Sequence, residues 1–119
     1  SMTAPEHDSV AYKILTREQR DSLFADGRFS GAPIDLTDGY IHMSTADQVQ
    51  GTLDKHFDGQ DDLHIAAVDL SALGDAVKWE ASRGNALFPH IYAALPLSAV
   101  IAHGPVHRDA TGTVQLPRA

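Results

Sequence analysis

The stretch Asp38-Gly39-Tyr40-Ile41-His42-Met43-Ser44-Thr45-Ala46-Asp47-Gln48 decides how this chain folds, because it leads from a strand directly into a helix. Its first half is short and β-prone. Its last four residues, Thr45–Gln48, have the Thr-x-x-Gln spacing of a capping box, in which both side chains bind orphan N–H groups at a helix start. Apolar residues from Val49 to Phe57 then recur on one helical face. We therefore expect a strand that gives way to a helix at Ser44 or Thr45.

The segment before this stretch predicts one strand, one helix and a loop. Val10–Leu15 alternates apolar with small or polar residues, which is typical of a strand with one buried face. Thr16–Gln19 is a second capping box and predicts a short helix that ends near Ala25. The segment from Asp26 to Gly39 is rich in Gly, Pro and Asp, so we expect an ordered surface loop there.

The segment after this stretch predicts mostly strands. Leu63–Leu70 is nearly continuous in apolar residues and fits a central strand that is buried on both faces. Further strands are expected at Val77–Glu80, His90–Leu95, Val100–His107 and Thr113–Leu116. Helices early and strands late predict an α+β fold, with a mainly antiparallel sheet and two short helices. We expect one domain, residues 10–119, after a loose tail of residues 1–9 in which Ser1 before Met2 has the form of a cloning scar.

Composition excludes several classes of function. The 119 residues contain no cysteine, so neither disulfides nor thiolate metal sites are available. The formal net charge of −7 opposes binding to bulk nucleic acid. No apolar run approaches the roughly 20 residues that span a membrane. We therefore expect a cytoplasmic protein whose partner is a small molecule or a nucleotide, with no membrane association.

The first candidate site is His42 with the two hydroxyl residues that follow it. The predicted strand delivers the His42 imidazole close to a helix start, where Ser44, Thr45 and free N–H groups would receive phosphate or carboxylate oxygens. The imidazole itself would hydrogen-bond a ribose hydroxyl. The alternative is that Ser44 and Thr45 only cap the helix and that His42 packs at the sheet edge.

The second candidate site lies between Trp79 and Tyr92. On a strand, His90 and Tyr92 point to the same face, and the Glu80 carboxylate is close in sequence. Such a group would bind a planar ring and polarise a hydroxyl. The alternative is that His90 and Tyr92 are ordinary residues of a half-buried strand.

Seven histidines raise the question of a metal site. His103 and His107 are separated by Gly104-Pro105, which excludes the helix that would bring both to one metal ion. The His-Glu-x-x-His pattern is absent, and His42, His90 and His103 are the only plausible ligand set. We expect no metal cofactor, and a metal-dependent hydrolase is the weakest of the alternatives.

Three motifs together resemble a known family. They are Asp38 to Thr45 with Gln48, then Lys78-Trp79-Glu80, then Phe88-Pro89-His90-Ile91-Tyr92 with Leu95-Pro96-Leu97 and Val100. In this order they resemble the bacterial family called domain of unknown function 952, over about Tyr12 to Val106. That family in turn is distantly similar to the ADP-ribosyltransferase superfamily, whose members bind NAD in a split, mostly antiparallel α+β fold.

The resemblance implies roles for individual residues. His42 would contact the nicotinamide-side ribose and Ser44 would supply the hydroxyl of the motif, with Met43 in place of the usual Gly. Tyr92 would pack against the nicotinamide ring. Glu80 would hold the ribose 2′-hydroxyl, although Glu80 and Tyr92 then stand in reversed order, and His90 would replace or assist Glu80.

Two readings of function follow from the residues and the resemblance. In the first, His42, Ser44, Thr45 and Tyr92 bind NAD or an ADP-ribose-like ligand, while Glu80 and His90 catalyse ADP-ribose transfer. In the second, the domain binds a small molecule or a protein without catalysis. The second predicts that Glu80 forms an internal hydrogen bond or ion pair, with Arg83 as a candidate partner, and faces away from any cleft.

Overall fold

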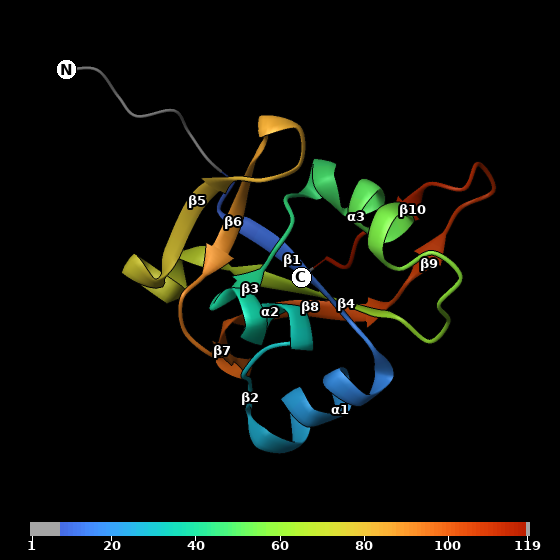
Figure 1. Ribbon diagram of the computed structural model, residues 1–119. Helices are drawn as coiled ribbons and strands as arrows, with labels where there is room; N and C mark the ends of the chain where they lie inside the picture. The colour runs from blue at the N-terminus through green and yellow to red at the C-terminus, as the bar shows by residue number, and fades with distance from the viewer. Residues whose placement is uncertain (1–7, 119) are drawn as a thin grey trace.

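The structure, a computed structural model, describes residues 8–118 apart from the side chain of Arg83 (Figure 1). The tail predicted for residues 1–9 therefore lies mostly outside the described part. In chain order the first half contains β1 (Val10–Leu15), α1 (Arg17–Asp26), β2 (Arg28–Phe29), α2 (Pro33–Asp38), β3 (Ile41–His42), η1 (Ala46–Gln48) and α3 (Val49–His56). The second half contains β4 (His64–Asp69), η2 (Leu70–Ala76), β5 (Val77–Ala81), η3 (Arg83–Asn85), β6 (Leu87–Ile91), β7 (Leu95–Pro96), η4 (Leu97–Ala99), β8 (Val100–Pro105), β9 (His107–Arg108) and β10 (Val114–Gln115).

The strands form several small antiparallel sheets, so the predicted α+β class is confirmed. One three-stranded sheet has the order β1-β4-β8 and the other has the order β3-β6-β5. Two further pairs, β2 with β7 and β9 with β10, complete the sheets among residues 8–118. No helix in this part of the chain has the length and apolar character needed to cross a membrane.

The two larger sheets meet beside β1, and this junction positions the candidate site. Ser44, just after β3, exchanges two backbone hydrogen bonds with Tyr12 of β1, at 2.7 and 2.9 Å. The Met43 N–H donates to the Pro89 carbonyl oxygen of β6 at 3.0 Å. The short strand β3 is therefore held from both sides, by β1 and by β6 (Figure 1).

The hydrophobic core lies on both faces of β1. Ala11 and Leu15 on one face belong to a cluster with Ile41, Met43 and Ile91, whereas Ile14 belongs to a second cluster on the other face. Because side chains alternate along a strand, Lys13 shares the face of Ala11 and Leu15. The Lys13 side chain is accordingly buried and needs an internal partner.

The prediction of a loop from Asp26 to Gly39 is wrong, because this segment contains the short strand β2 and the helix α2. Pro33 occupies the first turn, where a missing N–H costs nothing, and the Asp35 carboxylate accepts a hydrogen bond from the Ala32 N–H at 2.8 Å. Gly39 ends the helix with φ at 88°, a conformation that favours glycine. Six residues between turn formers were too few for a periodic signal.

The junction at Ser44 and Thr45 differs in detail from the prediction. The strand is only Ile41–His42, and a 3₁₀ turn at Ala46–Gln48 precedes the α-helix that starts at Val49. The Gln48 side chain accepts a hydrogen bond from the Thr45 N–H at 3.0 Å, as the capping box predicts. The late strand predicted for His90–Leu95 is also shifted, since β6 runs from Leu87 to Ile91 and Tyr92 follows it.

Candidate functional site

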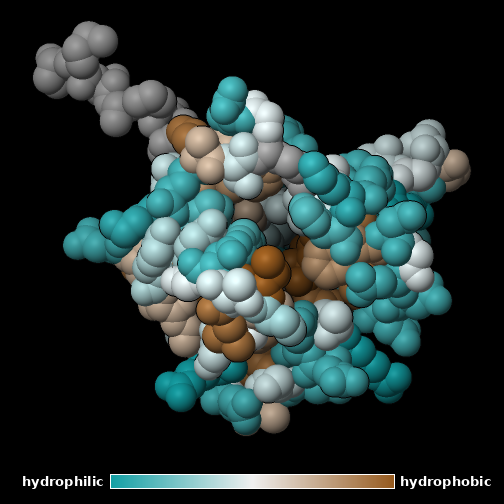
Figure 2. Space-filling view, in the orientation of Figure 1, coloured by the Kyte–Doolittle hydropathy of each residue, from teal (hydrophilic) through white to brown (hydrophobic). Residues whose placement is uncertain are grey.

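A cleft of about 670 Å³ opens between α2, α3, β1 and β6. Figure 2 shows it as a hollow near the centre of the molecular face, with brown apolar side chains in its wall. Three of the predicted site residues line the cleft, namely His42, Ser44 and His90. Glu80, Thr45 and Tyr92 do not form part of its wall. The predicted site is thus divided into a part inside the cleft and a part behind it.

The pairing of β3 with β6 brings the two cleft histidines together. His42 and His90 are directly opposite each other in this antiparallel pair, and their ring centroids are 5.5 Å apart. They are 48 positions apart in the sequence, yet they share one face of one small sheet. The two rings differ in what surrounds them.

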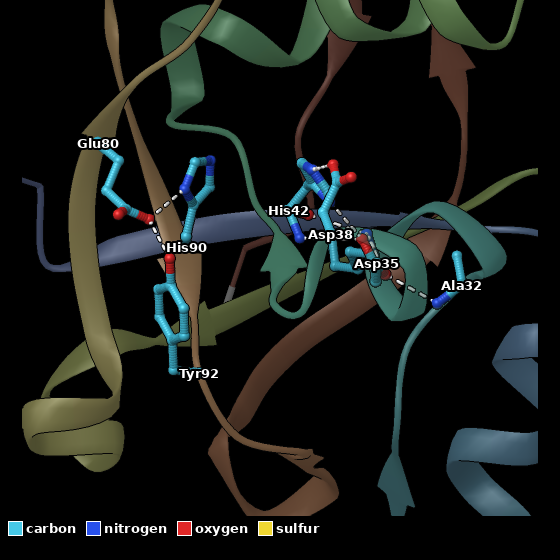
Figure 3. A network of polar contacts seen from close by, with 8 residues as sticks. Ala32, Asp35, Asp38, His42, Glu80, His90 and Tyr92 are labelled. Atoms are coloured by element: carbon cyan, nitrogen blue, oxygen red, sulfur yellow. Dashed lines mark hydrogen bonds and ion pairs between the residues drawn. The ribbon is translucent and has the colours of Figure 1, made fainter.

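His42 is enclosed by carboxylates from α2. Its Nδ1 lies 2.6 Å from Oδ1 of Asp35, and its Nε2 lies 2.9 Å from Oδ2 of Asp38 (Figure 3). Both ring nitrogens can donate only when both carry a proton, that is, in the imidazolium form. Because both ring nitrogens contact carboxylates, neither is available to take a proton from a ligand.

Asp35 is the buried centre of this network. Only 2% of the residue is exposed, and its carboxylate accepts from the Ala32 N–H, from the His42 N–H and from the Lys13 ammonium, which lies 3.1 Å from Oδ2. Lys13 is 6% exposed and also donates to the His42 carbonyl oxygen at 2.9 Å. The lysine that shares the apolar face of β1 therefore has its counter-ion in α2.

Burial and charge act in opposite directions on this ion pair. Burial alone would raise the pKa of Asp35, but the Lys13 charge and the hydrogen bonds from His42 and Ala32 outweigh it and hold that pKa below its usual value. Burial lowers the pKa of Lys13, and the nearby Asp35 carboxylate offsets only part of that effect. Both groups thus depend on each other for their charged states.

His90 has a different environment. Its Nδ1 lies 2.7 Å from Oε1 of Glu80, and the same oxygen accepts a hydrogen bond from the Tyr92 hydroxyl at 2.7 Å (Figure 3). No hydrogen bond of its Nε2 is found among residues 8–118, where the one ring contact of this kind is at Nδ1. Only 2% of His90 is exposed, and its ring lines the cleft. The arrangement presents one imidazole nitrogen to the cleft and fixes the other from behind.

The hydrogen bonds to Glu80 shift the pKa values of Glu80 and of the Tyr92 hydroxyl in opposite directions. Donation from Tyr92 and His90 lowers the pKa of Glu80 despite some desolvation, and the charges of His90 and Lys78 act in the same direction. The hydrogen bond to Glu80 is the main reason that the pKa of Tyr92 is raised to about 12. Glu80 is therefore the ionised acceptor that holds both donors.

Tyr40 covers the outer side of the two histidines. Its ring stacks on His90 at 4.1 Å between centroids with an angle of 24°, and it also contacts His42 and Tyr92 at 4.6 and 5.2 Å. Partial desolvation and the charges of Asp38 and Glu80 raise the pKa of Tyr40. The Tyr40 ring therefore covers one face of the His90 ring.

The hydroxyl residues of the first candidate site are engaged in the fold. The Ser44 hydroxyl is 3.0 Å from the Thr52 hydroxyl, and Ser44 is buried. The Thr45 N–H is already bonded to Gln48. Both residues thus take part in the local structure, but the Ser44 hydroxyl bonds the Thr52 side chain and not an N–H group at the helix start, and Ser44 remains in the cleft wall.

Sequence reasoning missed Lys13, Asp35, Asp38 and Tyr40. A signal for Lys13 was present, because a lysine in phase with Ala11 and Leu15 on a half-buried strand requires a buried counter-ion. The two carboxylates gave no signal while their helix was interpreted as a loop. Tyr40 was quoted in the motif but was assigned no role.

The three histidines considered for a metal site are not brought together. His103 lies on β8, where its Nδ1 is 3.0 Å from Nε2 of His64 and its ring contacts Phe24. Within residues 8–118 there is no group of three or more His, Asp or Glu side chains placed to hold a metal ion. The ligand set of His42, His90 and His103 is therefore wrong.

Comparisons with known proteins agree with the resemblance to the family called domain of unknown function 952. The model of the family described as "Protein of unknown function (DUF952)" matches residues 14–103. The crystal structure of protein CC0527 from Caulobacter crescentus is 46% identical over 89% of this chain and 93% of its own, with a TM-score of 0.81. The solution NMR structure of CC0527 is 46% identical over 90% of this chain and 91% of its own, with a TM-score of 0.76. No protein among those with curated descriptions matches.

Proposed function

This chain belongs to the DUF952 family, and we propose that it binds NAD or a related ADP-ribose-bearing nucleotide in the cleft beside His42 and His90. The observation that carries the proposal is the pair of imidazoles that lies in one wall of a cleft of about 670 Å³. That volume is within the usual range of small-molecule sites. The resemblance to ADP-ribosyltransferases supplies the ligand class.

The chemistry of the wall supports a nucleoside as the inserted part of the ligand. Apolar surface comes from Ile34, Met43 and Phe88, while Ser44 and Thr52 add hydroxyl groups. Apolar walls with a few polar groups are typical of sites that bind a flat base or ring and orient its sugar. A nucleobase or nicotinamide ring would lie on the apolar part, with the ribose towards the histidines.

In this arrangement His42 meets a ribose hydroxyl at its Nε2 edge. The present partner of that nitrogen, Asp38, is 37% exposed in its side chain, so a ligand hydroxyl can replace or bridge the contact at little cost in desolvation. Asp35 would keep the ring oriented from Nδ1 throughout. His42 thus contacts the ligand, and Ser44 is the second polar contact.

Transfer of ADP-ribose to an acceptor is the catalytic form of this proposal. The resemblance assigns the reaction to Glu80, with His90 assisting it, and Tyr92 to the nicotinamide ring. The observed contacts favour a different division, because Glu80 and Tyr92 reach the cleft only through His90. His90 would then be the catalytic residue that touches the ligand.

A non-catalytic binding domain is the second candidate, and the position of Glu80 favours it. Both hydrogen bonds of Glu80 described above are internal, and Glu80 is absent from the cleft wall. Its partners are His90 and Tyr92, whereas the predicted partner Arg83 has its side chain outside the described part of the structure. A binding domain would show nucleotide affinity without turnover.

Thermal unfolding with and without NAD, ADP-ribose and nicotinamide tests the proposal. A ligand at about 100 times its Kd stabilises the native state by about 2.7 kcal/mol, which raises the midpoint by several degrees in a domain of this size. The site variant is His42→Gln, which keeps a polar side chain near Asp35, and the matched control is His103→Gln on β8. We expect the shift in the wild type and the control, and a smaller shift in His42→Gln.

The same samples separate the two candidates. Release of nicotinamide from NAD by the wild-type protein would support transfer, whereas a thermal shift without release would support the non-catalytic domain. If neither NAD nor ADP-ribose shifts the midpoint at millimolar concentration, nucleotide binding at this cleft is wrong.

A further inference from the structure

We infer that His90 is the proton-accepting residue of the cleft and that Glu80 is its positioning residue. The inference goes beyond nucleotide binding, because it assigns a chemical role to one ring nitrogen. It rests on the proposed function only for the identity of the ligand.

The contact between Glu80 and His90 selects a tautomer. In a neutral imidazole one nitrogen donates and the other accepts, and the 2.7 Å contact with a carboxylate requires Nδ1 to be the donor. Nε2 then carries the lone pair. Because Nε2 has no hydrogen bond among the described residues and the ring lines the cleft, this lone pair is available to a ligand hydroxyl or a water molecule.

The ring is also held rigidly. β6 is the central strand between β3 and β5, so the backbone of His90 is paired on both sides. Tyr40 stacks on the ring, and Glu80 is itself fixed by the Tyr92 hydroxyl. A proton-transfer group that is oriented before the ligand binds needs little reorganisation in the reaction.

The other basic or acidic groups of the cleft are less suited to this role. His42 has both ring nitrogens on carboxylates, and the Lys13 ammonium donates to Asp35 and to a carbonyl oxygen. His56 also lines the cleft but is an exposed residue of α3, and the Asp38 carboxylate is engaged with His42. Nε2 of His90, on a residue that is 2% exposed, therefore combines a place in the cleft wall with the lack of a hydrogen-bond partner among the described residues.

The proton transfer can be written for NAD as the ligand. A water molecule loses a proton to Nε2 of His90 as its oxygen bonds to the ribose carbon that carries nicotinamide. The carbon–nitrogen bond breaks, and its electron pair remains on the ring nitrogen of the departing nicotinamide. NAD⁺ and water thus give ADP-ribose, neutral nicotinamide and one proton, which His90 returns to solvent. An alcohol in place of water would give an ADP-ribosylated acceptor.

The tautomer can be tested without any ligand, by long-range ¹H–¹⁵N correlation spectra of the histidine rings. We expect His90 in the wild type to carry its proton on Nδ1. Glu80→Ala should shift the ring towards the Nε2–H form, whereas Glu80→Gln, which keeps a carbonyl acceptor, should retain the wild-type form. Tyr92→Phe should retain it as well, because Glu80 stays in place. A wild-type His90 with its proton on Nε2 would overturn the inference.

The kinetic test uses release of nicotinamide from NAD. General-base residues contribute about 10²- to 10⁴-fold to a rate, so His90→Gln should lower kcat by that factor with little change in KM. Glu80→Ala should lose part of the rate and Glu80→Gln should recover some of it, while the surface variant His103→Gln should equal the wild type. An undiminished kcat in His90→Gln would overturn the role of His90 and leave nucleotide binding intact. If NAD does not bind at all, the proposed function fails and the tautomer spectra decide this inference.

Discussion

The two histidines of the cleft are neighbours on one small sheet, yet they occupy opposite kinds of environment. His42 lies among Asp35, Asp38 and Lys13, and both of its ring nitrogens are engaged. His90 is held at one nitrogen by Glu80 and presents the other to the cleft. The difference shows that a histidine in contact with a carboxylate is not enough to indicate chemistry. What matters is whether a nitrogen remains available.

The source of the difference is the element that faces each ring. The short helix α2 places carboxylates at Asp35 and Asp38, three positions apart, so both meet the His42 ring. On the other side, β5 contributes a single carboxylate, that of Glu80, and His90 and Tyr92 both contact the same oxygen of it. We therefore interpret His42 with Lys13, Asp35 and Asp38 as a structural anchor that also touches the cleft. His90 with Glu80 and Tyr92 is the reactive half.

The largest effect is expected when the anchor loses its cation. Lys13→Met leaves the Asp35 carboxylate buried without a counter-ion, and breaking a buried ion pair in this way costs about 3–5 kcal/mol. Urea denaturation measures the loss in the free energy of unfolding. The matched control is Lys78→Met, an exposed lysine near the Tyr92 ring, for which we expect a change within about 0.5 kcal/mol.

A double variant shows whether the cost belongs to the pair. Lys13→Met combined with Asp35→Asn removes both charges, so it should be less destabilised than the sum of the two single variants. Simple additivity would mean that Lys13 acts through packing alone, and the anchor would then not depend on this ion pair.

The second expected effect concerns acid. The pKa of Asp35 is held below its usual value, so its stabilising contribution is complete above the unfolded-state pKa of about 3.9 and is lost as the pH falls through the folded-state value. One such group changes the free energy of unfolding by at most about 1.4 kcal/mol per pH unit. Asp35→Asn should therefore flatten the stability curve below about pH 4, measured by urea denaturation at several pH values. An exposed carboxylate, in Asp58→Asn, is the comparison, and identical curves for the two variants would contradict the anchor role.

The anchor could be predicted from the sequence only in part. The alternation of β1 places Lys13 on the face of Ala11 and Leu15, and the motif from Asp38 to Thr45 identifies His42. Pro33 and Gly39 are the usual residues at the start and end of a helix, but a helix of six residues shows no period. Without α2 as a helix, Asp35 could not be placed beside Lys13.

The reactive half needed the register of β5 and β6. Glu80 pairs with Phe88, while His90 pairs with Lys78, so Glu80 and His90 meet across a diagonal of the two strands. Sequence reasoning grouped Glu80, His90 and Tyr92 correctly but could not tell that Glu80 would reach the cleft through His90. A shift of the register by one residue would have reversed the facing side chains.

A smaller effect is expected at the exposed end of the anchor. Asp38 contacts Nε2 of His42, and its side chain is 37% exposed, so Asp38→Asn should change the free energy of unfolding by no more than about 1 kcal/mol. The same substitution should weaken the contact at the His42 edge and leave nucleotide binding equal or tighter, as isothermal calorimetry with ADP-ribose would measure. Destabilisation as large as that of Lys13→Met would mean that the anchor extends to the surface.

The smallest and most local effect concerns Tyr92 behind His90. Its hydroxyl donates to Glu80, and this hydrogen bond, together with desolvation and the charges of Glu80 and Tyr40, raises its pKa to about 12. Glu80→Gln removes the negative charge that opposes ionisation of the phenol, so the pKa of Tyr92 should fall towards its ordinary value of 10. The chain has three tyrosines, and ultraviolet absorbance of tyrosinate in Glu80→Gln, with Tyr92→Phe to identify the step, measures the change.

This titration decides whether one charged oxygen of Glu80 accepts hydrogen bonds from both His90 and Tyr92. Suppose that the pKa of Tyr92 falls in Glu80→Gln while His90 keeps its proton on Nδ1. The charge of Glu80 then raises the pKa of Tyr92, whereas the position of its acceptor oxygen is enough to fix the His90 tautomer. If the Tyr92 step stays near 12, Glu80 is not the acceptor of the Tyr92 hydroxyl in solution. His90 would then be held by its own contact with Glu80 alone, and Tyr92 would not belong to the reactive half of the cleft.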